Sequence, residues 1–212
     1  RRAERFRHPR DRARWATARA ALRQILGCYT GIRPRELELT RGAWGKPALA
    51  GQTPLRFSLS HAGERAALAV AAGREAGIDL ERIDPDLDLA PLLAAACAPA
   101  ETARIEALPP GERAAALLAC WTVKEAYLKG MGTGLSRDPR DIEIVIATAP
   151  LRSRVTARDP LAVAPWALRL LDPGPGWVAA LAVAGAEPRL RQWSWPPGWP
   201  TRPNDQPSAF DR

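Results

Sequence analysis

The chain has 212 residues, of which 46% are hydrophobic and 25% charged, with 31 basic and 23 acidic side chains and a formal charge of +8. These proportions are typical of a soluble globular protein with one large domain or two small ones, and they exclude a disordered tail, a collagen and a coiled coil. The apolar runs are too short to cross a bilayer and no charged-then-apolar leader opens the chain. We therefore expect neither a membrane protein nor a secreted one.

The excess positive charge is confined to the N-terminal fifth of the chain. Residues 1–41 hold 12 arginines and 4 acidic residues, whereas the rest is balanced. Such a patch suits a polyanion, which could be nucleic acid, a phosphorylated cofactor or an acidic partner protein. A general preference for arginine, with 28 Arg against 3 Lys, explains the charge equally well. Charge alone therefore leaves the class of partner open.

The first predicted element is a helix over residues 11–27, which Gly27 is placed to end. Its apolar stripe consists of Trp15, Ala18, Leu22, Ile25 and Leu26. Short strand-like runs separated by Gly and Pro follow at 36–40, 55–60, 65–72 and 77–83.

A helical block comes next, over residues 89–98, 101–108 and 112–129, interrupted by prolines and closed by Gly130. Strands return at 141–148, 166–171, 177–184 and 190–195. The last dozen residues, rich in Pro and polar groups, indicate a loose tail. Three cysteines, Cys28, Cys97 and Cys120, lie in helical segments without CxxC spacing, so we expect reduced core thiols of a cytoplasmic protein.

The run Ala-Leu-Ala-Val occurs at 67–70 and again at 180–183, each time after a strand-like approach and before a turn. This echo suggests two related halves, although chance repetition is the alternative in so Ala-rich a chain. A shift of 113 residues places Gln192 and Ser194 opposite Asp79 and Glu81. Two halves would then make one site, because only one of them carries the acidic pair.

Asp79 and Glu81 alternate with Ile78, Leu80 and Ile83, and the period of a strand puts both carboxylates on one face. Neighbouring anions on a partly buried face raise each other's pKa, whereas a divalent cation between them removes the conflict. A solvated acidic face on an edge strand is the alternative for this segment taken alone.

Glu125 and Lys129 are four residues apart in the last predicted helix and share one face. A surface ion pair is the ordinary interpretation. A third carboxylate beside Asp79 and Glu81 would instead complete the oxygen set that Mg²⁺ prefers, with Lys129 free to meet a phosphate.

Ser60 and His61 close a strand before a tight turn, where a hydroxyl, an imidazole and backbone amides can converge on an anion. A nucleophilic Ser/His pair is disfavoured because adjacent strand residues point to opposite faces. The glycine-rich segment 130–134 lacks the lysine and the following helix of a nucleotide-binding P-loop.

Four motifs in order resemble those of the surfactin-type (Sfp-type) 4′-phosphopantetheinyl transferases. They are Trp44-Gly-Lys-Pro47, Phe57-Ser-Leu-Ser-His61, Gly77-Ile-Asp-Leu-Glu81 and Trp121-Thr-Val-Lys-Glu-Ala-Tyr-Leu-Lys129. Each motif is weak alone, but the ordered set behind an Arg-rich helix is specific, and it covers the chain from about Arg2 to Trp195. In one departure from the pattern, Cys97 stands where relatives often have an aromatic residue.

The resemblance implies a mixed α+β (α/β) fold with two pseudo-symmetric halves, residues 1–76 and 77–200, an active site between them, and a flexible tail over 201–212. It implies transfer of the 4′-phosphopantetheine arm of coenzyme A to a serine of an acyl or peptidyl carrier protein, with release of 3′,5′-ADP. The carriers would serve polyketide, fatty-acid or nonribosomal-peptide synthesis. We expect a Mg²⁺-dependent cytoplasmic monomer with no nucleic-acid or membrane partner.

The resemblance also assigns roles to residues of this chain. The implied Mg²⁺ ligands are Asp79, Glu81 and Glu125, and the implied holders of the coenzyme A phosphates are Ser60, His61 and Lys129. Lys46 and Pro47 would border the nucleotide, and Arg14 with Arg2 would receive its 3′-phosphate. The serine proton would go to Glu101 or to a Mg²⁺-associated water relayed by Glu125.

Two other functions remain open. A nucleic-acid-binding protein would use the helical arginines on phosphate backbones, although basic residues interleaved with exposed aromatics are absent. An inactive relative would bind coenzyme A or a carrier without turnover, and the retained carboxylates argue against it.

Overall fold

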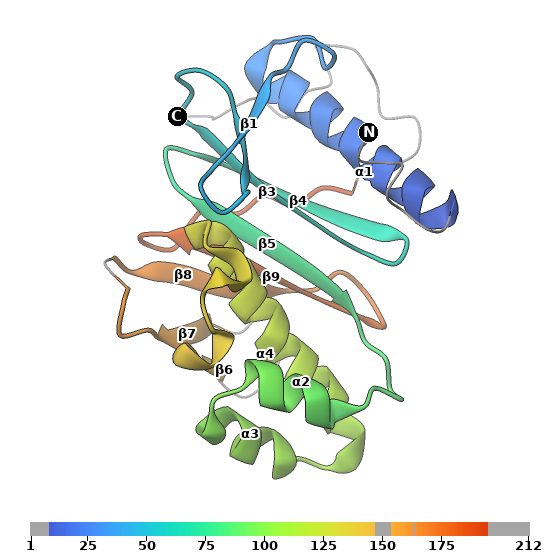
Figure 1. Cartoon of the computed structure of the whole chain (residues 1–212), viewed down its shortest axis with the longest axis vertical. Helices are drawn as coiled ribbons and strands as arrows, with labels where there is room; N and C mark the ends of the chain where they lie inside the picture. Colours follow the sequence, from blue (N-terminus) through green and yellow to red (C-terminus); the bar gives the residue numbers. More distant parts are fainter. Residues whose placement is uncertain (1–8, 147–153, 163, 195–212) are drawn as a thin grey trace. The chain divides into compact units, whose positions relative to one another are not determined.

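The computed structural model describes residues 9–146, 154–162 and 164–194 (Figure 1). The chain forms two compact units. The smaller unit comprises Arg1–Glu38 with Arg189–Arg212, and the larger unit is Leu39–Pro188. The predicted tail over 201–212 lies outside the described residues.

The described core of the smaller unit is helix α1, Pro9–Thr30. Of the predicted apolar stripe, Ala18, Leu22 and Leu26 are buried, whereas Trp15 and Ile25 are half-buried. Gly27 does not end the helix as predicted. It lies inside α1, where a Cβ would sit 2.9 Å from the carbonyl oxygen of Ile32 in the returning chain. Gly31 follows the helix instead, with φ of 71°, and its N–H donates to the Gly27 carbonyl.

The larger unit holds all the described strands. They are β1 (Leu39–Arg41), β2 (Pro47–Leu49), β3 (Leu55–Ala62), β4 (Arg65–Ala72), β5 (Ala76–Arg82), β6 (Glu143–Ile146), β7 (Arg154–Arg158), β8 (Trp166–Leu171) and β9 (Trp177–Ala184). β1 pairs with β2 and β3 with β4, while the other five form an antiparallel sheet in the order β5-β9-β8-β7-β6.

Helices of the larger unit fall between β5 and β6, as expected. They are α2 (Leu89–Ala96), α3 (Pro99–Glu106) and α4 (Pro110–Met131), followed by the 3₁₀ turns η2 (Gly134–Ser136) and η3 (Pro139–Asp141). Gly130 does not close α4 as predicted, because Gly132, with φ of 79°, makes the left-handed cap. Gly130 serves packing instead, since a Cβ there would lie 2.6 Å from Cζ3 of Trp166.

The strands differ from the prediction at three places. The expected strand over 190–195 is absent from its described part, residues 190–194, which are exposed. β2 and β7 were not expected. β2 is only three residues long, and β7 carries an arginine at each end.

Helix α4 lies across one face of the five-stranded sheet (Figure 1) and supplies more residues to the main core than any other element. Its buried residues pack against apolar side chains of β6, β8 and β9, among them Ile144, Leu168 and Val178. The opposite side of β5 and β9 packs against β4, where Ala69 meets Ile78 and Leu181. The mixture of helices and antiparallel sheets confirms an α+β fold.

The repeated Ala-Leu-Ala-Val falls on the second strand of two antiparallel hairpins, β3–β4 and β8–β9. The correspondence ends there, because β5 has no counterpart strand over the described residues around Gln192 and Ser194. The division into halves at residue 76 remains a prediction. Within the described residues, no helix is both long and apolar enough to span a membrane.

Candidate active site

The alternation predicted for β5 places its two carboxylates toward α4. Ile78 and Leu80 belong to apolar clusters on the other side of the strand, with Ala69 and with Trp177 respectively. Asp79 and Glu81, which alternate with them, reach side chains of α4. Asp79 is 2% exposed and Glu81 is half-buried.

Gly77, on the same face of β5, is the point where strand and helix come closest. A Cβ at this position would lie 1.9 Å from the carbonyl oxygen of Ala126 and 2.3 Å from the backbone nitrogen of Gly130. A side chain would therefore push α4 off the strand. The absence of one lets the helix approach the next residue on this face, Asp79.

The helix contributes one stripe of three side chains at four-residue spacing: Trp121, Glu125 and Lys129. The Trp121 indole donates to Oε1 of Glu81 at 3.4 Å. The Lys129 ammonium donates to Oδ1 of Asp79 and lies 3.9 Å from Oε2 of Glu125. The two carboxylates of β5 therefore contact the side chains of this stripe on α4.

Ser60 joins this group from β3. Its hydroxyl donates to Oδ1 of Asp79 at 2.7 Å and accepts from Lys129 at 3.2 Å. Ser60 lies in the first predicted half and Asp79 in the second. The structure therefore brings residues of both predicted halves into one cluster.

The pKa values of Glu81 and Glu125 are shifted by burial and by neighbouring charges. Burial raises the pKa of Glu81, and the Asp79 and Glu125 charges raise it further, against the opposing effects of Trp121 and Lys129. Burial likewise raises the pKa of Glu125, where Lys129 opposes and Asp79 adds to the effect. A single ammonium therefore does not offset the negative charge gathered here.

These residues fit a hard divalent cation. Oδ2 of Asp79 is buried and has no hydrogen-bond partner, so one oxygen is left for a further ligand. Carboxylate oxygens are the donors that Mg²⁺ prefers. Among the described residues, the group whose ligand atoms all lie within 4.8 Å of one another is a different one, Cys97, Glu101 and Cys120. Gathering Asp79, Glu81 and Glu125 around one ion would therefore require side-chain rotation.

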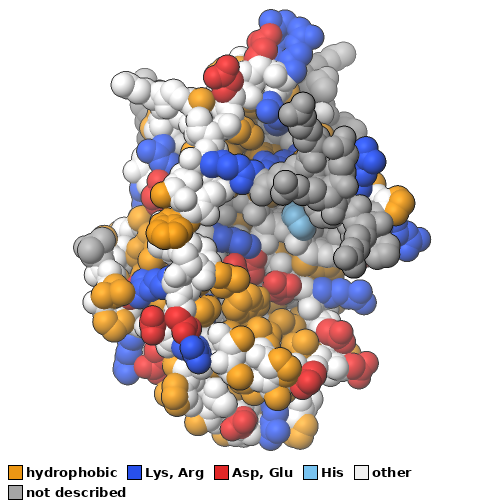
Figure 2. All heavy atoms as spheres, viewed as in Figure 1, with side chains coloured by type: hydrophobic (Ala, Val, Ile, Leu, Met, Phe, Trp, Pro, Cys, Tyr) orange, Lys and Arg blue, Asp and Glu red, His pale blue; other side chains and the backbone are white. Residues whose placement is uncertain are grey.

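His61 and Ser60 point to opposite sides of β3, since Ser60 is buried and His61 exposed. Figure 2 shows acidic and basic side chains close to one another on one face of the molecule. His61 is thus accessible to a ligand in the described part of the chain.

Lys46 acts as a bridge between segments. Its ammonium donates to Oε2 of Glu75 at 2.7 Å and to the carbonyl oxygens of Ala76 and Gly130 at 3.1 and 2.8 Å. These bonds fasten the start of β2, at Pro47, to β5 and to the end of α4. All three ammonium protons are occupied, so Lys46 reaches a nucleotide here only through its stem or backbone.

Glu101 lies in a separate buried network. Its Oε2 accepts from the backbone N–H of Ala98 at 2.6 Å and from the fully buried Lys124 at 2.5 Å, and its Oε1 accepts from the Ile144 N–H at 2.6 Å. Lys124 also donates to the Ala96 carbonyl at 2.7 Å. This network joins α3 to α4 and β6, and it does not include the Asp79 cluster.

The structure does not test the two arginines predicted for the 3′-phosphate. Arg2 lies outside the described residues. Arg14 is exposed on α1, which belongs to the smaller unit.

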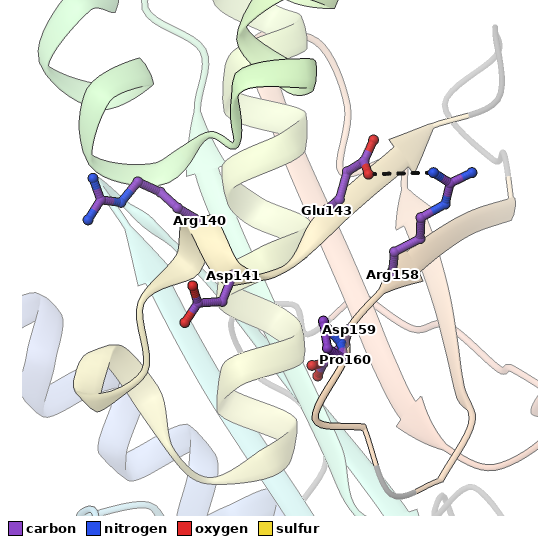
Figure 3. A pocket seen from close by; sticks show the side chains of 6 residues that line it. All are labelled: Arg140, Asp141, Glu143, Arg158, Asp159 and Pro160. Carbon is purple, nitrogen blue, oxygen red and sulfur yellow. Dashed lines mark ion pairs between the residues drawn. The ribbon is translucent and has the colours of Figure 1, made fainter.

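A separate hollow of about 480 Å³ lies at β6 and β7 (Figure 3). Its lining residues are Arg140, Asp141, Glu143, Arg158, Asp159 and Pro160, none of which was predicted for the site. Both arginines of the hollow form ion pairs, Arg158 with Glu143 at 3.6 Å and Arg140 with Asp138 at 2.6 Å.

Sequence reasoning missed the parts played by Trp121 and Lys124. Trp121 precedes Glu125 and Lys129 at the same four-residue spacing, so the helical period could have identified it. Lys124 carried no comparable signal, because a lysine within a helix is ordinarily exposed.

Comparison with known proteins places these motifs in a family. Residues 75–182 match the model of the 4′-phosphopantetheinyl transferase superfamily. The chain is 37% identical over 198 residues to the 4′-phosphopantetheinyl transferase HetI of a Nostoc species, covering 92% of this chain and 80% of the relative.

Two further relatives match a shorter part of the chain. It is 36% identical over 121 residues to the 4′-phosphopantetheinyl transferase AcpT of Escherichia coli, covering 57% of this chain and 58% of the relative. It is 37% identical over 126 residues to the L-aminoadipate-semialdehyde dehydrogenase-phosphopantetheinyl transferase of Eremothecium gossypii, covering 56% of this chain and 46% of the relative. The chain belongs to the 4′-phosphopantetheinyl transferase superfamily.

Proposed function

We propose that this protein transfers the 4′-phosphopantetheine group of coenzyme A to a serine hydroxyl of an acyl or peptidyl carrier protein, releasing 3′,5′-ADP in a Mg²⁺-dependent reaction. Fatty-acid, polyketide and nonribosomal-peptide synthesis all use such carriers. We further propose that it works as a cytoplasmic monomer.

The observation that carries the proposal is the environment of Asp79. This aspartate is buried with one oxygen unpaired, while Lys129 and Ser60 bond the other and two further carboxylates with raised pKa lie nearby. A buried excess of negative charge beside one ammonium suits a site that holds a cation and a phosphate together.

Asp79, Glu81 and Glu125 would hold Mg²⁺. When bound, the ion would neutralise charge that builds on the diphosphate of the departing nucleotide. Trp121 would orient Glu81 through its indole N–H, because a fixed carboxylate needs less ordering when its ligand arrives.

Lys129 and Ser60 would bind phosphate oxygens. The Lys129 side chain is 30% exposed, so its ammonium can leave Asp79 for a phosphate of coenzyme A once the carboxylate has another partner. The exposed His61 would add a contact from the other side of β3. Phosphoryl transfer depends chiefly on such alignment and charge neutralisation.

The serine proton would pass to a water molecule relayed by Glu125. Glu101 suits this role less well, since backbone N–H groups and Lys124 already occupy its oxygens.

Pro47 and the stem of Lys46 would border the nucleotide, and Arg14 and Arg2 would receive the 3′-phosphate. The assignment of the two arginines comes from the sequence resemblance and not from the placement of α1. A planar guanidinium would bind that phosphate through paired hydrogen bonds.

The test is to mix the protein with an apo carrier, coenzyme A and Mg²⁺ and to weigh the carrier intact. The panel should include fatty-acid, polyketide and peptidyl carriers. We expect at least one to gain the mass of phosphopantetheine on its serine, with an equal amount of 3′,5′-ADP. No gain on any carrier would contradict the proposed function.

A further inference from the structure

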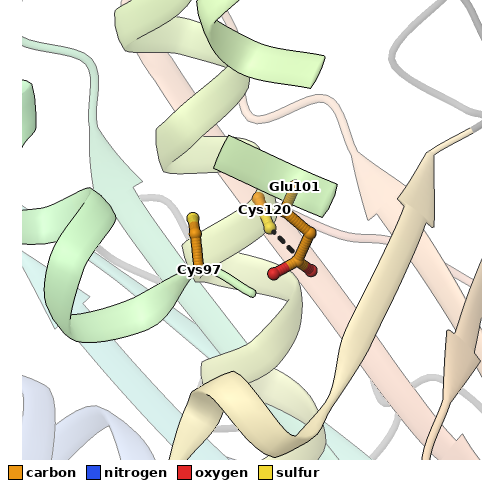
Figure 4. Close-up of side chains that lie close together, drawn as sticks. All are labelled: Cys97, Glu101 and Cys120. Atoms are coloured by element: carbon orange, nitrogen blue, oxygen red, sulfur yellow. Dashed lines mark hydrogen bonds between the residues drawn. The ribbon is translucent and has the colours of Figure 1, made fainter. Parts of the chain in front are cut away.

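Two thiols lie together in the main core, outside the carboxylate cluster. Cys97 follows the last residue of α2 and is 5% exposed, and Cys120 lies on α4 and is 4% exposed. Glu101 reaches them from α3, and the two sulfurs and a Glu101 oxygen all lie within 4.8 Å of one another (Figure 4). Three helical segments therefore converge on one pair of cysteines.

A metal centre is the first possibility for such a group, but Glu101 is already used. Its Oε2 accepts from Ala98 and Lys124, and its Oε1 accepts from Ile144. A structural zinc site needs four ligands, and an ammonium 2.5 Å from the carboxylate opposes a second cation. What remains is a pair of adjacent thiols.

The two thiols are chemically unequal. The Cys120 thiol donates to Oε1 of Glu101 at 3.4 Å (Figure 4). The same proton can turn to Cys97 instead. In that arrangement the hydrogen bond from Cys120 lowers the pKa of Cys97, and the Lys124 charge also favours its thiolate, against burial and the Glu101 charge. The same bond and burial raise the pKa of Cys120. Cys97 is therefore the thiol that ionises first and attacks an oxidant.

We propose that Cys97 and Cys120 form an intramolecular disulfide when the protein meets a peroxide. The Cys97 thiolate attacks one oxygen of hydrogen peroxide, which breaks the O–O bond and leaves a sulfenic acid and hydroxide. The Cys120 sulfur then attacks that sulfenic sulfur, its proton leaves with the departing oxygen, and the S–O bond gives way to S–S. Two thiols are oxidised by two electrons, and one peroxide becomes two waters.

The surroundings tolerate this bond. Oε1 of Glu101 loses the Cys120 thiol as a donor but keeps the Ile144 N–H, so no buried carboxylate oxygen is stranded. The bond would tie the end of α2 to α4 one residue before Trp121, which donates to Glu81. The site does not depend on the proposed transfer reaction.

The experiment treats the full native chain with hydrogen peroxide, then unfolds it and alkylates the remaining thiols. We expect the chain to lose the mass of two hydrogen atoms and to take up one alkyl group instead of three, because only Cys28 stays free. A peptide map should show Cys97 linked to Cys120. Cys97→Ala and Cys120→Ala should each prevent the loss, whereas Cys28→Ser should not.

The same treatment in concentrated urea is the control, and there we expect linkages to include Cys28. Three free thiols after treatment of the native chain would overturn the proposal, as would linkage to Cys28 or sulfinic acid at Cys97. Stoichiometric zinc in the purified protein that protects both thiols would also overturn it. The map of the unaltered chain does not depend on the variants folding.

Discussion

The buried carboxylates of the cluster lower the stability of the folded protein. Glu81 and Glu125 are held where burial and their neighbours disfavour ionisation, and Asp79 keeps an unpaired oxygen out of water. Such positions weaken the fold unless a ligand compensates them. The cluster can therefore be tested through stability as well as through activity.

Glu81→Gln should make the metal-free protein more heat-stable at neutral pH. The folded pKa of Glu81 is raised above its ordinary value of 4.5, so the fold loses stability as pH rises through the folded pKa. Glutamine does not titrate. The gain in Tm should therefore be largest near pH 7 and should vanish as pH falls below 4.5.

The measurement is thermal unfolding across pH in the presence of a chelator. Glu64→Gln, at an exposed glutamate, is the control and should show no such trend. A gain in Tm for Glu81→Gln that is the same at every pH would argue against a raised pKa.

The buried pair of Glu101 and Lys124 predicts a coupled response. Lys124→Met leaves a carboxylate charge without its ammonium and should lower the free energy of unfolding by about 3–5 kcal/mol. Adding Glu101→Gln should recover part of that loss, because the unmatched charge is then gone. The free energies of unfolding are measured with urea. If the loss in the double variant equals the sum of the losses in the two single variants, the two side chains are not coupled.

At the scale of elements, the site depends on how closely β5 approaches α4. The strand period correctly predicted that Asp79 and Glu81 share a face, and the helical period correctly paired Glu125 with Lys129. The crossing itself was not predictable, because it depends on Gly77 and Gly130 fitting against backbone and ring atoms far away in sequence. For the same reason, sequence placed the ends of α1 and α4 at glycines that instead serve packing.

Gly77→Ala should separate strand and helix. Its Cβ would fall 1.9 Å from the Ala126 carbonyl oxygen, which is backbone and cannot swing aside. We expect a loss of about 3 kcal/mol or more in the free energy of unfolding. We also expect the transfer activity of the protein that remains folded to fall, because Asp79 moves away from Lys129.

Gly111→Ala is the matched control. Gly111 is exposed in α4 and a Cβ there meets nothing within 4 Å, so the change should leave stability equal or raise it by up to ~1 kcal/mol. Equal stability of both variants would mean that β5 and α4 are not in the contact described.

At the scale of the molecule, the resemblance assigns chemistry to both compact units, although the carboxylate cluster lies wholly in the larger one. The charge excess of the N-terminal segment was evident from sequence, but its ligand was not, because arginines attract any polyanion. The match to the superfamily model covers residues 75–182 and not this segment, so coenzyme A as its ligand belongs to the proposed function.

Arg14→Ala should weaken the binding of coenzyme A more than the binding of dephospho-coenzyme A, which lacks the 3′-phosphate. A charge-assisted contact of about 1.5–3 kcal/mol corresponds to a tenfold or larger rise in KM for coenzyme A alone. Arg10→Ala, on the same helix, should affect both substrates alike. Equal losses with Arg14→Ala would remove this arginine from the 3′-phosphate site.

The central claim is that Asp79 anchors a Mg²⁺-dependent transfer site, and its most direct test is the transfer rate of Asp79→Asn. The variant keeps the shape of the side chain but loses the charge, so we expect a fall of roughly a hundredfold or more at every Mg²⁺ concentration, with the fold retained. Asp86→Asn, the same change at an exposed position, should leave the rate unaltered. Transfer by Asp79→Asn at the unaltered protein's rate and Mg²⁺ dependence would contradict the account.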